Sequence, residues 1–159
     1  MMTIDPQAVA ETLNKLIEVC LDGELGYRTA AAHIHNTNLH IVLSDNALRR
    51  AEFAKELRAE VERLGAHASH SGSIAASLHR GWIALKSAVS HGGAKGIIAA
   101  CETGEDSAFD SYVAAIKSDL PSETRSLVEA QWRAVDESRR QLRHINAEIA
   151  AGKIHAETD

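Results

Sequence analysis

A five-residue pattern, Cys-x-x-Gly-Glu, occurs twice in this chain and carries side chains that can bind metal. The first copy runs from Cys20 to Glu24 and the second from Cys101 to Glu105, and together they hold both cysteines of the protein. Glu102 stands three residues before Glu105, so a helix would present both carboxylates on one face. Carboxylates that meet inside a protein are paired, protonated or bound to metal. The repeat therefore predicts a buried acidic cluster drawn from two helices.

The turns of the chain indicate which residues share a level. Antiparallel helices joined by a tight turn match residues that are equidistant from that turn. A turn centred near Asn38 sets Glu24 opposite Glu52, and a second turn near Leu120 brings the other two glutamates to a comparable height. A carboxylate-rich layer inside a four-helix bundle is the geometry of di-iron and di-manganese sites. Our first hypothesis is a site for one or two ions of iron or manganese, whose ligands are Glu24, Glu52, Glu102 and Glu105, with Tyr27 or Tyr112 supporting them.

Arginines give the same glutamates a second interpretation. Di-iron bundles carry Glu-x-x-His on two of their helices, but Lys55 follows Glu52 by three residues, and arginine occupies position 139. A cation at a ligand position opposes metal binding and can pair with the carboxylates instead. In this second hypothesis the protein is a non-catalytic structural or interaction bundle, and its buried glutamates pair with Arg28, Arg50 or Arg139.

The other reactive side chains are assigned to the framework. Cys20 and Cys101 stand in apolar rows without an activating neighbour, so we predict that they fill the core. Histidines of the first turn and the later loop lack zinc-site spacing and are predicted to be solvated: His33, His35, His40, His67 and His70. Phosphate-loop, nucleotide and hydrolase motifs are absent from the sequence, so enzymatic activity is not predicted.

Hydrophobic residues at helical spacing define the elements that must position these groups. Asp5 is a suitable N-cap, and Pro6 and Pro121 suit the first positions of helices. The residues His91 to Gly93 should interrupt the pattern, and residues 65–73 form a polar loop. The predicted helices are Pro6–His35, Leu39–Leu64, Ile74–Ser90, Ala94–Ser118 and Pro121–Ala150.

The long link between the second and third of the four main helices contains the extra helix, Ile74–Ser90. Such a link permits a crossover along the bundle, which is the connectivity of ferritin-like folds. We therefore predict an all-α, ferritin-like four-helix bundle as a single domain over residues 1–150, with a flexible tail over residues 151–159. Gly23 and Gly104 are expected to stay inside continuous helices and to permit a close approach, because the apolar rows continue in phase on both sides.

Several local motifs resemble those of a known family. They are Leu13-Asn14-x-Leu16-Ile17-Glu18, Asp22-Gly23-x-x-Gly26-Tyr27, Arg50-Ala51-Glu52-Phe53-Ala54-x-Glu56-Leu57, Gly72-Ser73, Leu78-His79-Arg80-Gly81-Trp82, Cys101-Glu102-x-Gly104-Glu105-Asp106, Tyr112 and Asp119-Leu120-Pro121. Together they resemble a bacterial family of uncharacterised ferritin-like four-helix-bundle proteins, a domain-of-unknown-function family, over residues 8–146. This resemblance implies a ferritin-like bundle and a place in stress physiology.

The charge and composition of the chain bear on its cellular location and its binding partners. The formal net charge of −5 argues against binding to nucleic acid or to an anionic membrane. Long apolar runs and a signal-peptide pattern are absent, so a cytoplasmic location is predicted. Trp82, in the motif with His79 and Arg80, is predicted to seal one end of the bundle or to form an interface. We expect a homo-oligomer, with a dimer favoured.

Overall fold

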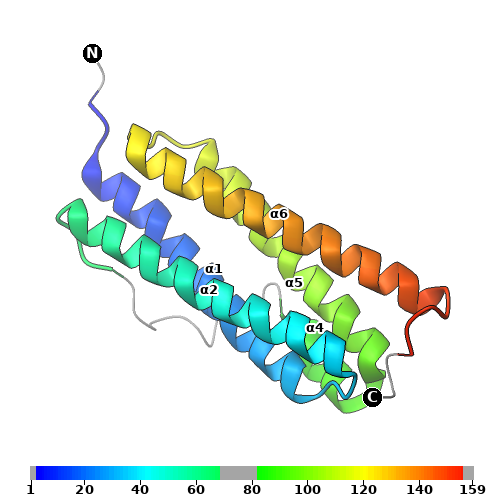
Figure 1. The fold of residues 1–159 in the computed structure, drawn as a ribbon. Helices are drawn as coiled ribbons and strands as arrows, with labels where there is room; N and C mark the ends of the chain where they lie inside the picture. The colour runs from blue at the N-terminus through cyan, green and yellow to red at the C-terminus, as the bar shows by residue number, and fades with distance from the viewer. Residues whose placement is uncertain (1–2, 69–81, 156–159) are drawn as a thin grey trace.

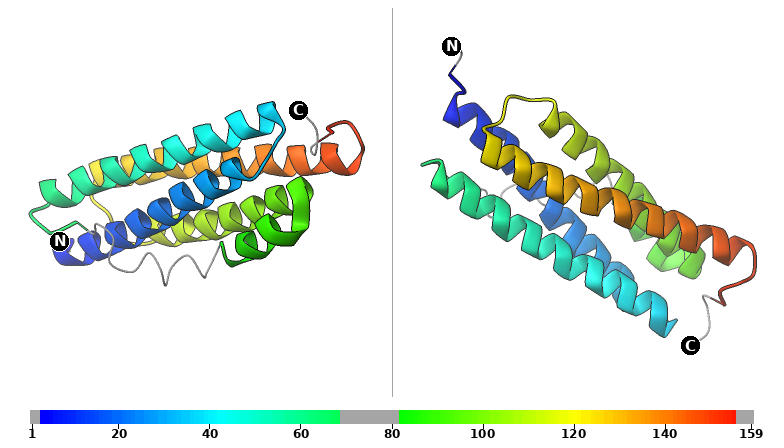
Figure 2. Two further views of the ribbon diagram at one scale, coloured as in Figure 1. Left: turned by 90° about the horizontal axis from the view of Figure 1, so that it is seen from below. Right: turned by 45° about the horizontal axis from the view of Figure 1, so that its top comes forward.

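Four long helices lie side by side in an elongated bundle, as Figures 1 and 2 show. The computed structural model describes residues 3–68 and 82–155, and every regular element within these ranges is helical. The prediction of an all-α four-helix bundle is confirmed. The helices α1 and α2 form one antiparallel hairpin, and α5 and α6 form the second. Their bounds are Pro6–Ala32 for α1, Thr37–Arg63 for α2, Gly93–Ile116 for α5 and Ser122–Ala150 for α6.

Polar side chains cap both helices of the first hairpin. The side chain of Asp5 accepts a hydrogen bond from the backbone N–H of Gln7 at 3.0 Å, and Pro6 opens α1 as predicted. The side chain of Asn36 accepts from the N–H of Leu39 at 3.0 Å. Because this cap satisfies a donor of the first turn, α2 begins at Thr37, two residues earlier than the sequence pattern predicts.

A short helical segment leads into the second hairpin. It consists of α4, Ile83–Ser87, followed by a π-helical turn over Ala88–Gly92, and α5 continues directly from it. The predicted interruption is confirmed at Gly93, whose φ of 61° lies in the left-handed region that favours glycine. The first part of the predicted crossover helix, residues 74–81, lies outside the described residues.

The core consists of two apolar clusters, one toward each end of the bundle. One cluster includes Tyr27, Leu43, Ile98 and Leu142, and the other includes Leu13, Leu57, Tyr112 and Val135. Along each long helix, the buried apolar residues at one end belong to one cluster and those at the other end to the other cluster. The change falls at a comparable height on all four helices. On α2, α5 and α6 the residues at this change are Arg50, Glu105 and Ser138, all of them buried. A polar layer therefore divides the core near its middle.

The chain beyond α6 turns back onto the bundle. Ile154 packs against the cluster that contains Tyr27, and the side-chain amide of Asn36 donates to the carbonyl of His155 at 3.4 Å. The predicted flexibility of residues 151–159 stays a prediction. Within the described ranges, none of the helices combines the length and the apolar character that a membrane span requires.

Candidate functional site

The central feature of the polar layer is an ion pair between Arg50 of α2 and Glu105 of α5. These residues are only 2% and 1% exposed. The Arg50 Nη2 atom donates to Glu105 Oε1, and the hydroxyl of Tyr27, from α1, donates to Glu105 Oε2. Each carboxylate oxygen of Glu105 thus has its own donor, and three helices are joined at one point.

The charges of this group stabilise one another. Burial alone would lower the pKa of Arg50, but the adjacent Glu105 carboxylate outweighs burial and raises that pKa above its usual value. Burial, and then the negative charge of Glu105, hold the pKa of Tyr27 well above its usual value. Arg50 is consequently a permanent cation, and Tyr27 is a neutral hydrogen-bond donor at physiological pH.

A second network of hydrogen-bonded side chains continues along the bundle axis. The Tyr112 hydroxyl donates to Gln131 Oε1 at 2.6 Å and lies 3.2 Å from the sulfur of Cys20. The Gln131 amide nitrogen donates in turn to Glu56 Oε1 at 3.0 Å and to the carbonyl of Phe53 at 3.3 Å. Gln131 is buried, and these contacts satisfy its donor and its acceptor, as buried amides require.

Trp82 closes the core beside Tyr27. Its indole makes an edge contact with the Tyr27 ring, with centroids 5.0 Å apart and an interplanar angle of 70°. The ring occupies a cleft between Gly26 of α1 and Gly104 of α5, where an added Cβ at either glycine would lie only 2.4 Å from an indole carbon. The close approach predicted at Gly104 is therefore made by a tryptophan side chain, and its partner glycine is Gly26. Gly23 instead faces the stem of Arg50, at 3.2 Å from its hypothetical Cβ.

The four predicted metal ligands occupy different environments. Glu24 pairs with Arg28 one turn along α1, and Glu102 accepts from Arg143 at 3.2 Å. Glu52 is exposed, and of the four only Glu105 is buried. Within the described ranges, no three histidine, cysteine, aspartate or glutamate side chains are grouped so that they could hold a metal ion. Of the four, Glu105 alone lies in the buried polar layer, and metal binding by these glutamates stays a prediction.

Helical phase explains why Arg50 lies in the layer and Glu52 lies outside it. Successive residues of an α-helix are rotated by about 100°, so two residues that are two positions apart point in nearly opposite directions. Because Arg50 points into the core, Glu52 must point out of it. Arg50 stands seven residues from both Leu43 and Leu57, which are also buried. This spacing of seven was the signal in the sequence that could have identified Arg50 as the inward member of the layer.

The two cysteines are buried and free, as predicted for core residues. Burial raises the pKa of the Cys20 thiol to about 11, and burial followed by the charge of Glu105 raises that of Cys101 further. The thiolate form, which is the reactive one, is therefore suppressed in the folded protein.

We expect this burial to make the fold sensitive to alkali. A thiol that ionises near pH 9 when unfolded and near 11 when folded stabilises the fold fully below pH 9. That stability is lost as the pH rises toward 11, because the unfolded state ionises first. Ionisation of Cys20 alone should lower the free energy of unfolding by about 1.4 kcal/mol by pH 10. Urea unfolding at pH 7, 9 and 10 would measure this, and Cys20→Ala should reduce the slope. An unchanged slope in that variant would refute this assignment.

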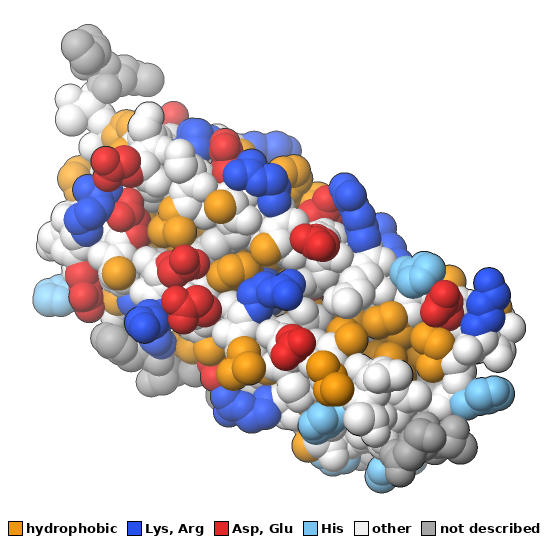
Figure 3. Space-filling model, in the orientation of Figure 1, with side chains coloured by type: hydrophobic (Ala, Val, Ile, Leu, Met, Phe, Trp, Pro, Cys, Tyr) orange, Lys and Arg blue, Asp and Glu red, His pale blue; other side chains and the backbone are white. Residues whose placement is uncertain are grey.

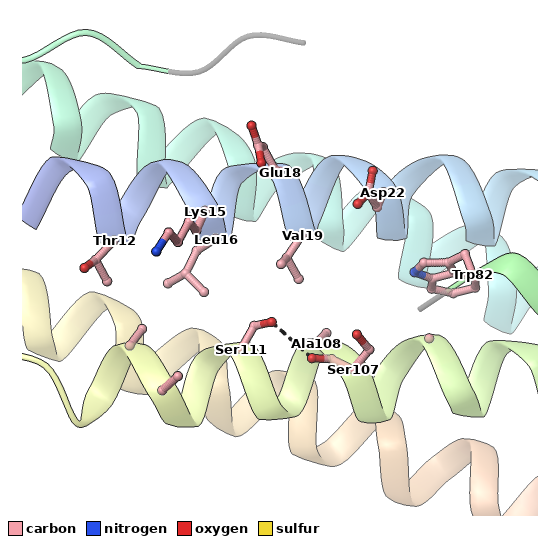
Figure 4. A pocket seen from close by; sticks show the side chains of 13 residues that line it. Thr12, Lys15, Leu16, Glu18, Val19, Asp22, Trp82, Ser107, Ala108 and Ser111 are labelled. Carbon is pink, nitrogen blue, oxygen red and sulfur yellow. Dashed lines mark hydrogen bonds between the residues drawn. The ribbon is translucent and has the colours of Figure 1, made fainter. Parts of the chain in front are cut away.

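A groove of about 260 Å³ lies on another side of Trp82, between α1 and α5. Lys15 and Glu18 of α1 and Ser107 and Ser111 of α5 lie along it, with Trp82 toward one end, as Figure 4 shows. Trp82 contacts both the groove and Tyr27, so its indole is the boundary between this groove and the buried ion pair.

The arrangement of the four long helices is the fold of a ferritin-like four-helix bundle. A mutant of Dps1 from Mycobacterium smegmatis has a similar structure, with a TM-score of 0.77 and 17% sequence identity. The match covers 89% of this chain and 96% of that one. Among curated proteins, none matches this sequence significantly.

The sequence also matches a family model over residues 8–118, described as a domain of unknown function, DUF2383. This match extends over more than half of the chain. The protein therefore belongs to the DUF2383 family, as the resemblance predicted.

Proposed function

We propose that this protein is an interaction bundle that associates with a second copy of itself, and that its polar layer holds the helices in register. The observation that carries this proposal is the buried pairing of Glu105 with Arg50. The competing function is iron or manganese binding through Glu24, Glu52, Glu102 and Glu105.

The chemistry of the layer fits a metal ion poorly. A divalent cation bound by oxygen atoms needs several carboxylates or carbonyls that converge on it. Here both oxygens of Glu105 already accept hydrogen bonds, from Arg50 and Tyr27. A metal ion at Glu105 would also lie next to the positive charge of Arg50, among buried side chains. These contacts support the ion-pair hypothesis over the metal hypothesis.

A buried ion pair is better suited to specifying the packing than to strengthening it. Desolvation of two charges costs several kcal/mol, and an apolar pair of the same size is often equally stable. A buried polar group nevertheless penalises a shift in helix register, because the shift would leave a charge without its partner. Arg50, Glu105 and Tyr27 join α2, α5 and α1 at one height, so a sliding movement of any of them would break a charged contact.

In this proposal the protein acts by binding a partner through its surface. Charge and composition favour a protein partner over nucleic acid, and a cytoplasmic location stays a prediction. Trp82, for which the sequence left both a core position and an interface open, is buried in the core. Any contact between copies must accordingly use other residues.

Metal titration tests this proposal. Protein purified without an affinity tag or chelator should contain iron, manganese and zinc well below one ion per chain. Adding each metal should leave the melting temperature unchanged, and the Glu105→Gln variant should behave in the same way. Stoichiometric binding by the wild-type protein, lost in Glu105→Gln, would instead establish the competing function.

A further inference from the structure

We infer that the outer face of the α1–α2 hairpin is the surface on which a second copy of this chain docks. This inference rests on the proposed function and gives its interaction a defined surface. Leu48 and Ile41 of α2 are 71% and 51% exposed, and Leu25 of α1 is 38% exposed. They account for three of the five large apolar side chains that are exposed in the described part of the chain. Figure 3 shows the side on which α2 and α6 face the viewer, where apolar side chains are interspersed with charged ones.

The contacts inside the hairpin place these residues at matching heights. His40 Nδ1 lies 2.8 Å from the carbonyl oxygen of Ala31, and the stem of Arg50 packs beside Gly23. Because α1 and α2 are antiparallel, Leu25 of α1 lies between these two contacts, near the height of Leu48 of α2.

For the same reason, Arg28 lies near the height of Asp45. The Arg28 side chain is largely exposed, and Asp45 is exposed as well. The face therefore carries an apolar residue and a cation on α1, and an apolar residue and a carboxylate on α2.

This pattern is complementary to itself. In a symmetric dimer a two-fold axis relates one copy of the surface to the other. An axis parallel to the bundle, between α1 and α2, would lay α1 of one copy on α2 of the other. Leu25 would then contact Leu48 of the second copy at the same height, and Arg28 would meet Asp45. Each of these contacts would occur twice.

A binding partner of different sequence could not form each of these contacts twice. Charge complementarity between two identical faces specifically favours a second copy and also fixes its orientation. The contact would cover the most exposed leucine of the described residues, which a monomer would leave in water.

Sedimentation equilibrium tests the surface itself. The wild-type protein should have twice the 17.1 kDa mass of the chain. Leu48→Glu should raise the dissociation constant at least 100-fold and yield a monomer with an unchanged circular dichroism spectrum. Ile83→Glu is the matched control, because Ile83 is similarly exposed but lies on α4, and it should remain dimeric. A monomeric wild-type protein, or a Leu48→Glu variant that stays dimeric, would overturn the inference.

A charge exchange tests the orientation. Arg28→Glu alone should weaken the dimer at least tenfold, because it sets a carboxylate at position 28 against Asp45 of the second copy. Adding Asp45→Arg should restore most of the lost affinity. Failure of this rescue, with the loss in the single variant, would overturn the proposed two-fold arrangement. Metal titration of the Leu48→Glu monomer separates the two proposals, since metal uptake there would refute the proposed function and leave the docking surface untouched.

Discussion

Replacing Arg50 by methionine is expected to lower the free energy of unfolding by about 3 to 5 kcal/mol. Methionine matches the length of the arginine stem but leaves the Glu105 carboxylate buried without a cation. Of the two side chains that donate to this carboxylate in the wild-type protein, only Tyr27 would remain. Urea unfolding, followed by circular dichroism at pH 7, would give the loss directly.

The surface pair between Glu102 and Arg143 provides a matched control. It contains the same two residue types, but about half of the Arg143 side chain is exposed. Arg143→Met should therefore cost no more than about 1 kcal/mol. Combining Arg50→Met with Glu105→Gln should recover roughly 2 to 3 kcal/mol of the single-variant losses, because no charge is then left unpaired. A small effect of Arg50→Met, additive with that of Glu105→Gln, would show that the two residues are not coupled.

Gly104→Ala is expected to expel the Trp82 ring from its cleft and to destabilise the bundle by about 1 to 3 kcal/mol. Alanine is the better helix former by about 1 kcal/mol, so a loss of stability must come from the steric conflict. The new Cβ would lie 2.4 Å from the indole, and α1 and α5 would have to separate to admit it. In a Trp132→Phe background, the fluorescence of Trp82 should shift to longer wavelength as the ring becomes hydrated.

Gly96 on the same helix is the control for this change. A Cβ at Gly96 would meet only the Cβ of Ala88, at 3.7 Å, which is an ordinary contact. Gly96→Ala should thus stabilise the protein by up to about 1 kcal/mol and leave the Trp82 emission unchanged. Equal stabilisation by both alanine variants would refute the cleft as the binding place of Trp82.

The sequence predicted the helices well because their signals are local. Apolar spacing defined the long helices, Asp5 with Pro6 located the start of α1, and the glycine at position 93 marked the interruption before α5. Each of these inferences needs only neighbouring residues and helix geometry.

The membership of the layer depends on contacts that are distant in sequence. Arg50 is charged and resembles a surface residue until its spacing of seven from Leu43 and Leu57 is noticed, whereas Glu52 looks equally suitable as an inward residue. The sequence also did not indicate the role of Gly26, because Trp82, whose ring packs against this glycine, is far from it in the sequence. Counting residues from a turn predicts the height of a residue, whereas its orientation about the helix axis must be deduced from the apolar spacing on both sides of it.

Anomalous diffraction from crystals of the protein soaked in manganese, iron or zinc salts would show directly whether Glu105 binds a metal ion or Arg50. We predict no anomalous peak within bonding distance of Glu105, with Arg50 still donating to that carboxylate. A peak coordinated by Glu105, with the Arg50 guanidinium turned away, would contradict the ion-pair assignment.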